Sequence, residues 1–409
     1  MKRLCLLLMV AFALLIAFPG IGVAQDEITV ISSDADPDFP YRITFNLEAE
    51  STTEITDIDL AYRLERLSLA PISYRVDADF TPGPRVNASW TWNMLETGGL
   101  PPGVEVEYWW LIEDATGQKI ESSPATVKFD DLSYDWSSLT SDQVTLYWYE
   151  GDHSFAEELI DAADEALERL ASDTGVSLEQ PARFYIYASF EELRGALVYP
   201  YEWTGGLTFT DYGIIAIGIS PDNLTWGKRT VAHELAHLVI QEATFGPYGD
   251  LPTWLNEGLA TYAEGELESD FQFQLNKAVS EDELISVRSL SSSFPADPVQ
   301  ARLSYAQSYS LVRFLLDNYG KDKLLELLDV FKEGSGYDDA LLQVYGFDMD
   351  GLNALWRASL GLEPQPTPTP TVPLVDLSGL FSLLPTILIV GLVFAALFIY
   401  LTLHLLRRR

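Results

Sequence analysis

The sequence predicts a multidomain protein with an all-β sandwich at the N-terminus, then an α+β domain, then one transmembrane helix. Three observations lead to this fold class. Residues 26–135 alternate between apolar and polar positions in short runs, residues 140–362 contain a few strands followed mainly by helices, and residues 386–406 carry no charge. A chain of 409 residues with 47% hydrophobic side chains has enough material for more than one core.

The N-terminal domain is predicted from the spacing of its strands. Alternating runs at 41–47 and 104–112 are separated by turn residues at 81–84 and 101–103. Alternation turns every second side chain toward the buried face of a sheet. The length, the aromatic content and the strand spacing favour an immunoglobulin-like β-sandwich over residues 26–135.

The second domain, at 140–362, shows a mixed pattern. We expect strands at 144–149, 182–187 and 213–219, and a helix at 155–170 whose apolar residues share one face. The strand around 214–219 is a candidate edge strand that would pair with an extended peptide. Helices follow almost to residue 361, which is typical of an α+β domain.

The two ends of the chain are hydrophobic. Residues 1–25 have the pattern of a secretory signal peptide, with Lys2 and Arg3 before an apolar run and small residues at the cleavage site. Residues 386–406 are long enough to cross a bilayer, and the basic residues 407–409 form the expected cytoplasmic tail. This pattern predicts a single-pass protein of the cell membrane whose folded domains lie on the extracellular side.

A linker rich in Pro and Thr separates the folded domains from the predicted membrane helix. Residues 363–379 contain alternating Pro and Thr, which form neither helix nor sheet. We expect an extended, semi-rigid spacer that holds the folded domains away from the membrane.

The charge and the cysteine content exclude several classes of function. The net charge is −36, from 61 acidic and 25 basic side chains, so a nucleic-acid partner is excluded. The acidity predicts a well-solvated surface or, as an alternative, an acid-lined groove for cationic substrates. The only cysteine, Cys5, lies in the predicted signal peptide, which excludes disulfides, thiolate catalysis and a Cys-ligated metal in the mature protein.

One segment of the second domain carries a metal-binding pattern. His233, Glu234 and His237 form a His-Glu-x-x-His motif in a stretch without helix breakers. Histidines four residues apart lie on the same helix face, so both imidazoles reach one metal ion, and Glu234 projects toward a water on that metal. No separate cofactor-binding motif accompanies it.

A catalytic zinc needs a third protein ligand and an open position. Of the other histidines, His404 lies in the predicted membrane helix and His153 is expected to be structural or exposed. An extended form of the motif, with a third histidine as ligand, would need Gly at position 240 and His at position 243. The sequence has Ile240 and Ala243 at these positions. A carboxylate is therefore the leading possibility, and Glu257, separated from His237 by 19 residues, is the candidate.

The spacing of these residues resembles a known family. His-Glu-x-x-His followed by Asn-Glu-Gly is similar to the gluzincin zinc metallopeptidases, residues 254–258 are similar to the aminopeptidase N family, and the domain resembles the peptidase MA-like group. The resemblance implies an α+β gluzincin (thermolysin-like) metallopeptidase domain and a polypeptide substrate. It also implies one Zn²⁺ per chain, bound by His233, His237 and Glu257.

The resemblance also implies a mechanism. Glu234 would act as general base toward a zinc-activated water, and a downstream tyrosine would stabilise the oxyanion. Tyr305 is the better candidate for that tyrosine and Tyr309 its rival. The sequence departs from the aminopeptidases at 205–207, where Gly-Gly-Leu replaces an acidic residue that would bind a substrate amino terminus, so endopeptidase activity stays open.

Two rival functions stay open at this stage. A surface binding or adhesion protein would use the N-terminal β domain and keep the zinc domain as a structural part. The enzyme would alternatively hydrolyse peptide cross-links of a cell wall.

Overall fold

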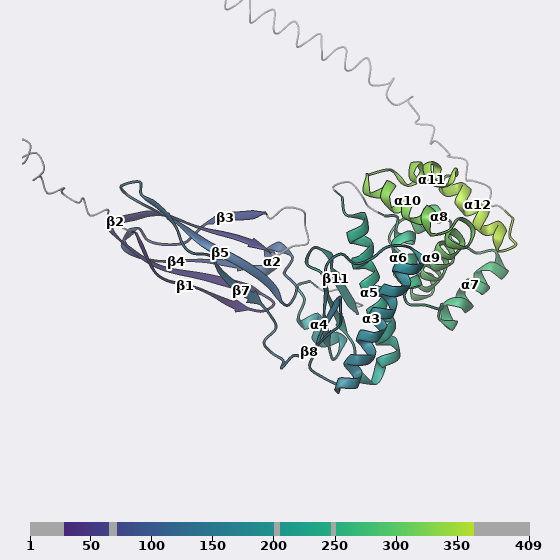
Figure 1. Ribbon diagram of the computed structural model, residues 1–409, viewed down its shortest axis with the longest axis horizontal. Helices are drawn as coiled ribbons and strands as arrows, with labels where there is room; N and C mark the ends of the chain where they lie inside the picture. Colours follow the sequence, from purple (N-terminus) through teal and green to yellow (C-terminus); the bar gives the residue numbers. More distant parts are fainter. Residues whose placement is uncertain (1–27, 65–71, 200–204, 247–250, 364–409) are drawn as a thin grey trace, which may run out of the picture. The chain divides into compact units, whose positions relative to one another are not determined.

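The computed structural model describes residues 28–64, 72–199, 205–246 and 251–363 (Figure 1). The predicted signal peptide, the membrane helix at 386–406, the tail at 407–409 and nearly all of the linker lie outside these residues. In the described part of the chain, no helix combines the length and the apolar character needed to span a membrane.

The N-terminal domain is built from strands, as predicted. All of its strand pairs in the described residues are antiparallel and belong to one hydrogen-bonded sheet. Its elements are β1 (Thr29–Asp38), β2 (Arg42–Leu64), β3 (Ser73–Asp77), β4 (Gly83–Asn93), a short helix α2 (Met94–Thr97), β5 (Val104–Asp114), β6 (Lys119–Glu121) and β7 (Ala125–Phe129).

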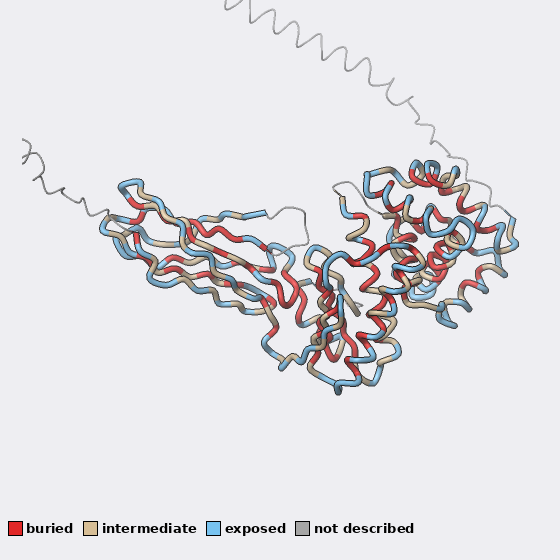
Figure 2. The backbone as a smooth tube through the Cα atoms, viewed as in Figure 1, coloured by how far each residue is buried: buried red, intermediate tan, exposed pale blue. Residues whose placement is uncertain are grey.

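The long strand β2 joins the two halves of this domain. Its first half pairs with β1 and β4, with Phe45 opposite Ala35 and Trp90, and its second half pairs with β5 and β3. Buried and more exposed residues alternate along β5 and the first half of β2, whereas residues 58–62 in the second half of β2 are all buried (Figure 2). The strand-rich domain is confirmed. Its immunoglobulin-like sandwich topology stays a prediction, because β1 to β7 are hydrogen-bonded into one sheet through β2 and β5.

The second domain contains a five-stranded sheet in the order β11-β12-β10-β9-β8. Its strands are β8 (Ser137–Thr140), β9 (Val144–Trp148), β10 (Ala182–Tyr187), β11 (Gly206–Phe209) and β12 (Ile214–Gly218). β9 and β12 both run parallel to β10, and helix α3 (His153–Asp173) supplies the long crossover that a parallel β9–β10 pair needs. The strands predicted at 144–149, 182–187 and 213–219 are therefore present.

One prediction about this sheet is wrong. The strand at 214–219 is not an edge, because β12 lies between β10 and β11. The edge on this side of the sheet is β11, which the sequence pattern did not indicate because it has four residues and begins with a glycine. Short strands of this kind give too few alternating positions for a periodic signal.

Helices make up the remainder of the domain, as predicted. The connecting helix α4 (Phe190–Gly195) is followed, after the sheet, by α5 (Leu224–Thr244), α6 (Thr253–Ala263), α7 (Ser269–Glu281), α8 (Val287–Leu290), α9 (Pro298–Tyr319), α10 (Lys321–Lys332), α11 (Tyr337–Tyr345) and α12 (Met349–Ser359).

Helices α3 and α5 cover one face of the five-stranded sheet. Leu159 of α3 and Leu235 of α5 are fully buried in the same cluster as Phe184 and Ile217 of the sheet. Burial of each such side chain contributes roughly 1.5–3 kcal/mol. This packing fixes α5 against the sheet and determines which face of the helix is left for other use.

The opposite face of the sheet is also buried. Tyr185 and Tyr187 project from it into a cluster with β-domain residues such as Phe129. The Arg183 guanidinium donates a hydrogen bond from Nη1 to the carbonyl oxygen of Gly103 at 3.2 Å, and a side chain at Gly103 would collide with the Tyr185 ring. Both faces of this sheet are therefore covered within the described chain.

Helices α6 and α9 approach each other closely at Gly258. A Cβ atom at this position would lie 2.5 Å from the carbonyl oxygen of Ser308 and 2.8 Å from Cγ2 of Val312, both in α9. A backbone oxygen cannot move away as the end of a flexible side chain can. The glycine that follows Glu257 is therefore required by the packing of α6 on α9.

Replacing Gly258 with alanine tests this packing. We expect Gly258→Ala to lower the free energy of unfolding by about 1–3 kcal/mol, because overpacking outweighs the gain in helix propensity. The matched control is Gly195→Ala at the end of α4, where no atom lies within 4 Å of the added Cβ. Chemical denaturation followed by circular dichroism measures both, and equal stability of the two variants would contradict the interpretation.

Candidate metal centre and active site

Helix α5 divides its two faces between the core and the site. Val231 and Leu235 are fully buried against the sheet, whereas His233, Glu234 and His237 are each partly exposed on the other side. The helix runs without a break from residue 224 to residue 244. The 3.6-residue period therefore places both histidines on one face, one turn apart, as predicted.

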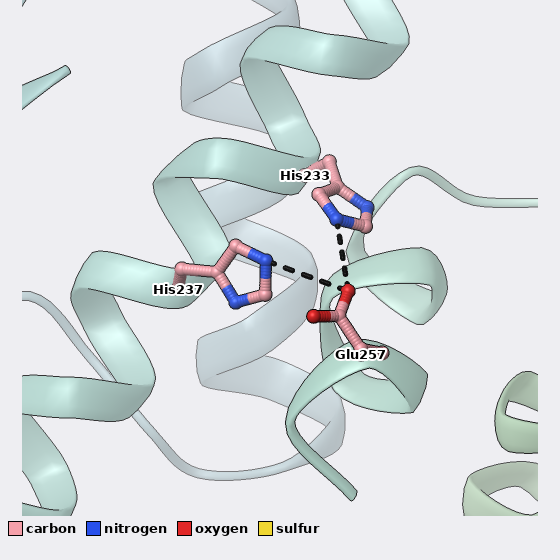
Figure 3. A group of neighbouring side chains, drawn as sticks. All are labelled: His233, His237 and Glu257. Atoms are coloured by element: carbon pink, nitrogen blue, oxygen red, sulfur yellow. Dashed lines mark ion pairs between the residues drawn. The ribbon is translucent and has the colours of Figure 1, made fainter. Parts of the chain in front are cut away.

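The structure brings Glu257 to these two histidines. Helix α6 places one carboxylate oxygen of Glu257, Oε2, 3.4 Å from Nε2 of His233 and 3.7 Å from Nε2 of His237 (Figure 3). One ligand atom of each residue lies within 4.8 Å of the others. Of the described residues, these three alone form such a group.

The geometry fits a zinc ion. Ligand atoms about 2.1 Å from a tetrahedral zinc are roughly 3.4 Å apart, and the observed separations are 3.4 and 3.7 Å. Oε2 of Glu257 is buried and has no hydrogen-bond partner of good geometry. A buried carboxylate oxygen without a donor is costly, and a cation removes that cost. The donor set of two imidazoles and one carboxylate is a catalytic zinc set.

Two side chains that the sequence analysis missed hold the imidazole rings. Nδ1 of His233 lies 2.9 Å from Oε1 of Glu264, and Nδ1 of His237 lies 3.3 Å from Oδ1 of Asn256. Both partner oxygens are acceptors, so each Nδ1 carries the proton and each Nε2 is left for a metal. A signal was present, since Glu264 is two helical turns after Glu257 and Asn256 directly precedes it.

The charges of these groups are coupled. Burial lowers the pKa of His233, but the carboxylates of Glu257 and Glu264 outweigh this effect and raise the pKa to about 10. Burial would raise the pKa of Glu257, yet the imidazoles of His233 and His237 outweigh it and lower that pKa. In the metal-free protein, a proton on His233 therefore balances the buried carboxylate charge.

Glu234 lies at the wall of a cleft, close to the edge strand. Thr208 of β11 donates a hydrogen bond from its hydroxyl to Oε2 of Glu234 at 2.6 Å. A Cβ atom at Gly206 would lie 2.9 Å from Oε1 of the same carboxylate. The glycine therefore leaves the space that the Glu234 carboxylate occupies, and Thr208 fixes its orientation.

Tyr305 of α9 lines the same cleft. Its ring centroid lies 6.1 Å from that of His233, and the ring is supported edge-on by Phe294 at 5.1 Å. Burial and the carboxylates of the site raise the pKa of Tyr305, so its hydroxyl stays protonated and is a hydrogen-bond donor. The rival Tyr309 packs near Tyr262 and accepts a hydrogen bond from Arg313.

The cleft has a volume of about 450 Å³. Segments that are distant in the sequence line it. They are Gly205, Gly206 and Leu207 around β11, Trp226, Arg229, Thr230, His233 and Glu234 of α5, Glu264, Glu268 and Phe271 around the start of α7, and Tyr305 of α9. A cleft of this size, with charged and aromatic walls, has room for part of an extended peptide.

His153 and Thr261, both described by the structure, are not part of the ligand group. The His153 side chain is 65% exposed and faces Glu157 at 3.5 Å, away from the metal ligands in sequence and structure. Thr261 is buried and donates a hydrogen bond to the main-chain oxygen of Glu257 at 2.8 Å within α6. His404 lies outside the described residues.

The raised pKa of His233 predicts that zinc uptake releases a proton. At pH 7, His233 of the metal-free protein is protonated, because its pKa is about 10, and zinc binds only the neutral imidazole. We expect roughly one proton released per zinc at pH 7, with zinc affinity rising as the pH rises. Calorimetric titration in two buffers of different ionisation enthalpy measures the proton count, and a count near zero would contradict the charge balance.

Comparisons with known proteins agree with the motif. The sequence model of the Peptidase MA superfamily matches residues 162–361, which include every metal-ligand candidate. No curated protein matches the chain.

Several solved structures resemble the chain at low identity. They include aminopeptidase A of Legionella pneumophila with aspartic acid (12% identity, 84% of this chain and 50% of that one, TM-score 0.37), the M1 zinc metallopeptidase of Deinococcus radiodurans (13%, 84% and 96%, 0.30) and wild-type OgpA of Akkermansia muciniphila (12%, 26% and 28%, 0.21). The chain thus spans about a quarter of the length of OgpA and half of the Legionella enzyme. These TM-scores support no argument about function.

The family match includes the helix of the His-Glu-x-x-His motif, the helix of the Asn-Glu-Gly motif and the helix of Tyr305. The resemblance predicted from the sequence is confirmed. Residues 162–361, most of the α+β domain, thus match the sequence model of the Peptidase MA superfamily.

Proposed function

We propose that this protein is a membrane-anchored, extracytoplasmic zinc metallopeptidase that hydrolyses peptide bonds, with Glu234 as its general base. The observation that carries the proposal is the convergence of His233, His237 and Glu257 beside a cleft that Glu234 and Tyr305 also line. A metal-ligand set beside a base and a hydrogen-bond donor is an arrangement for hydrolysis.

The protein groups have separate roles in this reaction. Zinc, when bound, lowers the pKa of a water molecule to about 7 and polarises the scissile carbonyl. Glu234 accepts the proton of the attacking water and passes it to the departing amine. Thr208 holds the Glu234 carboxylate in one orientation by its 2.6 Å hydrogen bond.

Tyr305 and the edge strand position the peptide. The protonated hydroxyl of Tyr305 donates a hydrogen bond to the oxygen that becomes negative during attack. β11 is the edge of the sheet and lines the cleft through Gly206 and Leu207. An edge strand suits an extended substrate that pairs as one more strand. The peptide edge proposed for residues 214–219 thus belongs to β11.

A catalytic rather than a structural metal centre is supported by the ligand count. Structural zinc sites have four protein ligands, whereas catalytic sites have three and an open position. The described residues provide three ligands, and the group adjoins the cleft. A structural zinc site in an adhesion protein would need neither the free position nor Glu234.

The cellular location rests on sequence features alone. The secretory signal at 1–25, the apolar segment at 386–406 and the basic residues 407–409 support an extracellular domain with a single-pass anchor. Protease accessibility of the folded domains on intact cells tests this placement, since an internal domain would be protected.

Removing the general base tests the mechanism. We expect Glu234→Gln to lower kcat by about 10²–10⁴-fold, because the amide cannot accept the proton, while zinc content stays at one per chain. Cleavage of a peptide library by the purified chain, with and without chelator and read by mass spectrometry, measures the activity. A Glu234→Gln variant as active as wild type would refute the proposal.

The oxyanion role is tested by a matched pair of tyrosines. We expect Tyr305→Phe to lower kcat by about 10²-fold with little change in KM, because one donor to the developing charge is lost. Tyr309→Phe, four residues away on the same helix and outside the cleft lining, is expected to keep wild-type kcat. Equal effects of the two substitutions would show that Tyr305 has no special role.

A further inference from the structure

Arg229 of α5 lies one helical turn before His233 and contacts three groups of one short segment. Its Nη2 is 2.9 Å from Oε2 of Glu264, its Nε is 2.8 Å from Oε1 of Glu268, and its Nη1 donates a hydrogen bond to the carbonyl oxygen of Glu266 at 3.1 Å. The two carboxylate contacts are close ion pairs rather than well-aligned hydrogen bonds. One side chain therefore ties the whole segment 264–268 to the active-site helix.

The segment that Arg229 contacts has two tasks at the site. Glu264 bonds to Arg229 through one carboxylate oxygen and to Nδ1 of His233 through the other. Glu268 directly precedes α7 and lines the cleft together with Phe271 of that helix. Gly265 between them has a φ of +100°, so the chain turns sharply here. The position of both carboxylates thus depends on what holds this turn.

The contact set requires an arginine. The Arg229 side chain is 21% exposed, and that of Glu264 is 12% exposed, so the pair is largely shielded from water. A guanidinium presents donors in a planar fork, whereas a lysine is a single point charge that cannot reach three acceptors in different directions. Without a cation here, the Glu264 carboxylate would be drawn toward solvent or toward other donors.

We propose that Arg229 is a positioning residue that fixes the Glu264 carboxylate against Nδ1 of His233 and so sets the zinc affinity of the site. Through Glu268 it fixes the adjoining cleft wall as well. In this role Arg229 acts on the metal ligand through Glu264 and on the cleft wall through Glu268. The inference rests on the proposed zinc site and goes beyond it, since it assigns a function to a residue outside the ligands and the general base.

Zinc affinity of the full-length chain is the direct measurement, by competition with a chelating indicator. We expect Arg229→Lys and Glu264→Gln each to weaken zinc binding by about 10–100-fold, because partners that orient a ligand have effects of this size. The double variant is expected to be no weaker than Glu264→Gln alone, since both act through one contact. Glu268→Gln is expected to keep wild-type zinc affinity and to change KM.

The neighbouring residue supplies a matched control. Lys228 is on the same helix turn, and its Nζ lies 2.6 Å from Glu158. Lys228→Met removes one positive charge and one ion pair without touching Glu264, so it should bind zinc as wild type does. If Arg229→Lys does not fold, Arg229→Gln, which keeps a neutral N–H₂ donor, replaces it in the same zinc titration. The expected result is again weakened zinc binding.

Three results would overturn the inference. Wild-type zinc affinity in Arg229→Lys beside a weakened Glu264→Gln would show that Arg229 only joins two helices. Equal losses in Lys228→Met and Arg229→Lys would show a general charge effect. Additive losses in the double variant would show two independent contacts. A wild-type chain without zinc affinity would instead refute the proposed function, so the two failures are distinct.

Discussion

The buried carboxylate of Glu257 is the constraint on which the rest of the site depends. Its buried Oε2 atom has no hydrogen-bond donor in good geometry, and imidazole nitrogens of His233 and His237 lie 3.4 and 3.7 Å from it. An ionised group of this kind is stable in a protein interior only beside a compensating charge. A proton on His233 provides that charge in the metal-free chain, and a divalent cation provides it when bound. The remaining contacts of the site maintain this balance: Glu264 and Asn256 orient the rings, and Arg229 compensates the second carboxylate.

The packing of helices α5, α6 and α9, rather than the local sequence, brings the side chains of the site together. Helix α5 is held against the sheet by Val231 and Leu235, so its histidines face away from the sheet. Helix α6 can place Glu257 opposite them because Gly258 lets it lie directly on α9. Helix α9 in turn carries Tyr305. The Asn-Glu-Gly sequence therefore combines three physical needs: a ring holder, a metal ligand and a close helix contact.

Much of the site was predictable from the sequence because its signals are periodic. Histidines four residues apart on a helix define positions that the 3.6-residue period converts into geometry. Glu257, on another helix, was predicted because no other histidine was available and because the Asn-Glu-Gly motif resembles a known family. The edge strand β11 was not predictable, since four residues give no period, and the strand at 214–219 was wrongly placed at the edge for the same reason. The sequence also did not predict that the long strand β2 pairs with different strands in its two halves. Pairing partners depend on the register across the whole sheet. Arg229 and Glu264 are ordinary charged residues in the sequence, and only their mutual placement gives them a role.

The support of the metal centre and the wall of the cleft are one structure. Glu264 touches a metal ligand, Glu268 lines the cleft, and the two are separated by a single turn that Arg229 holds from α5. A change that moved α7 to admit a different side chain would also pull on the carboxylate that orients His233. In the proposed peptidase, substrate preference and metal affinity are therefore linked through this turn. Leu207 lines the cleft from β11, and no candidate metal ligand lies on that strand. A substitution at Leu207 could therefore change the substrate preference of the proposed peptidase without changing its metal affinity.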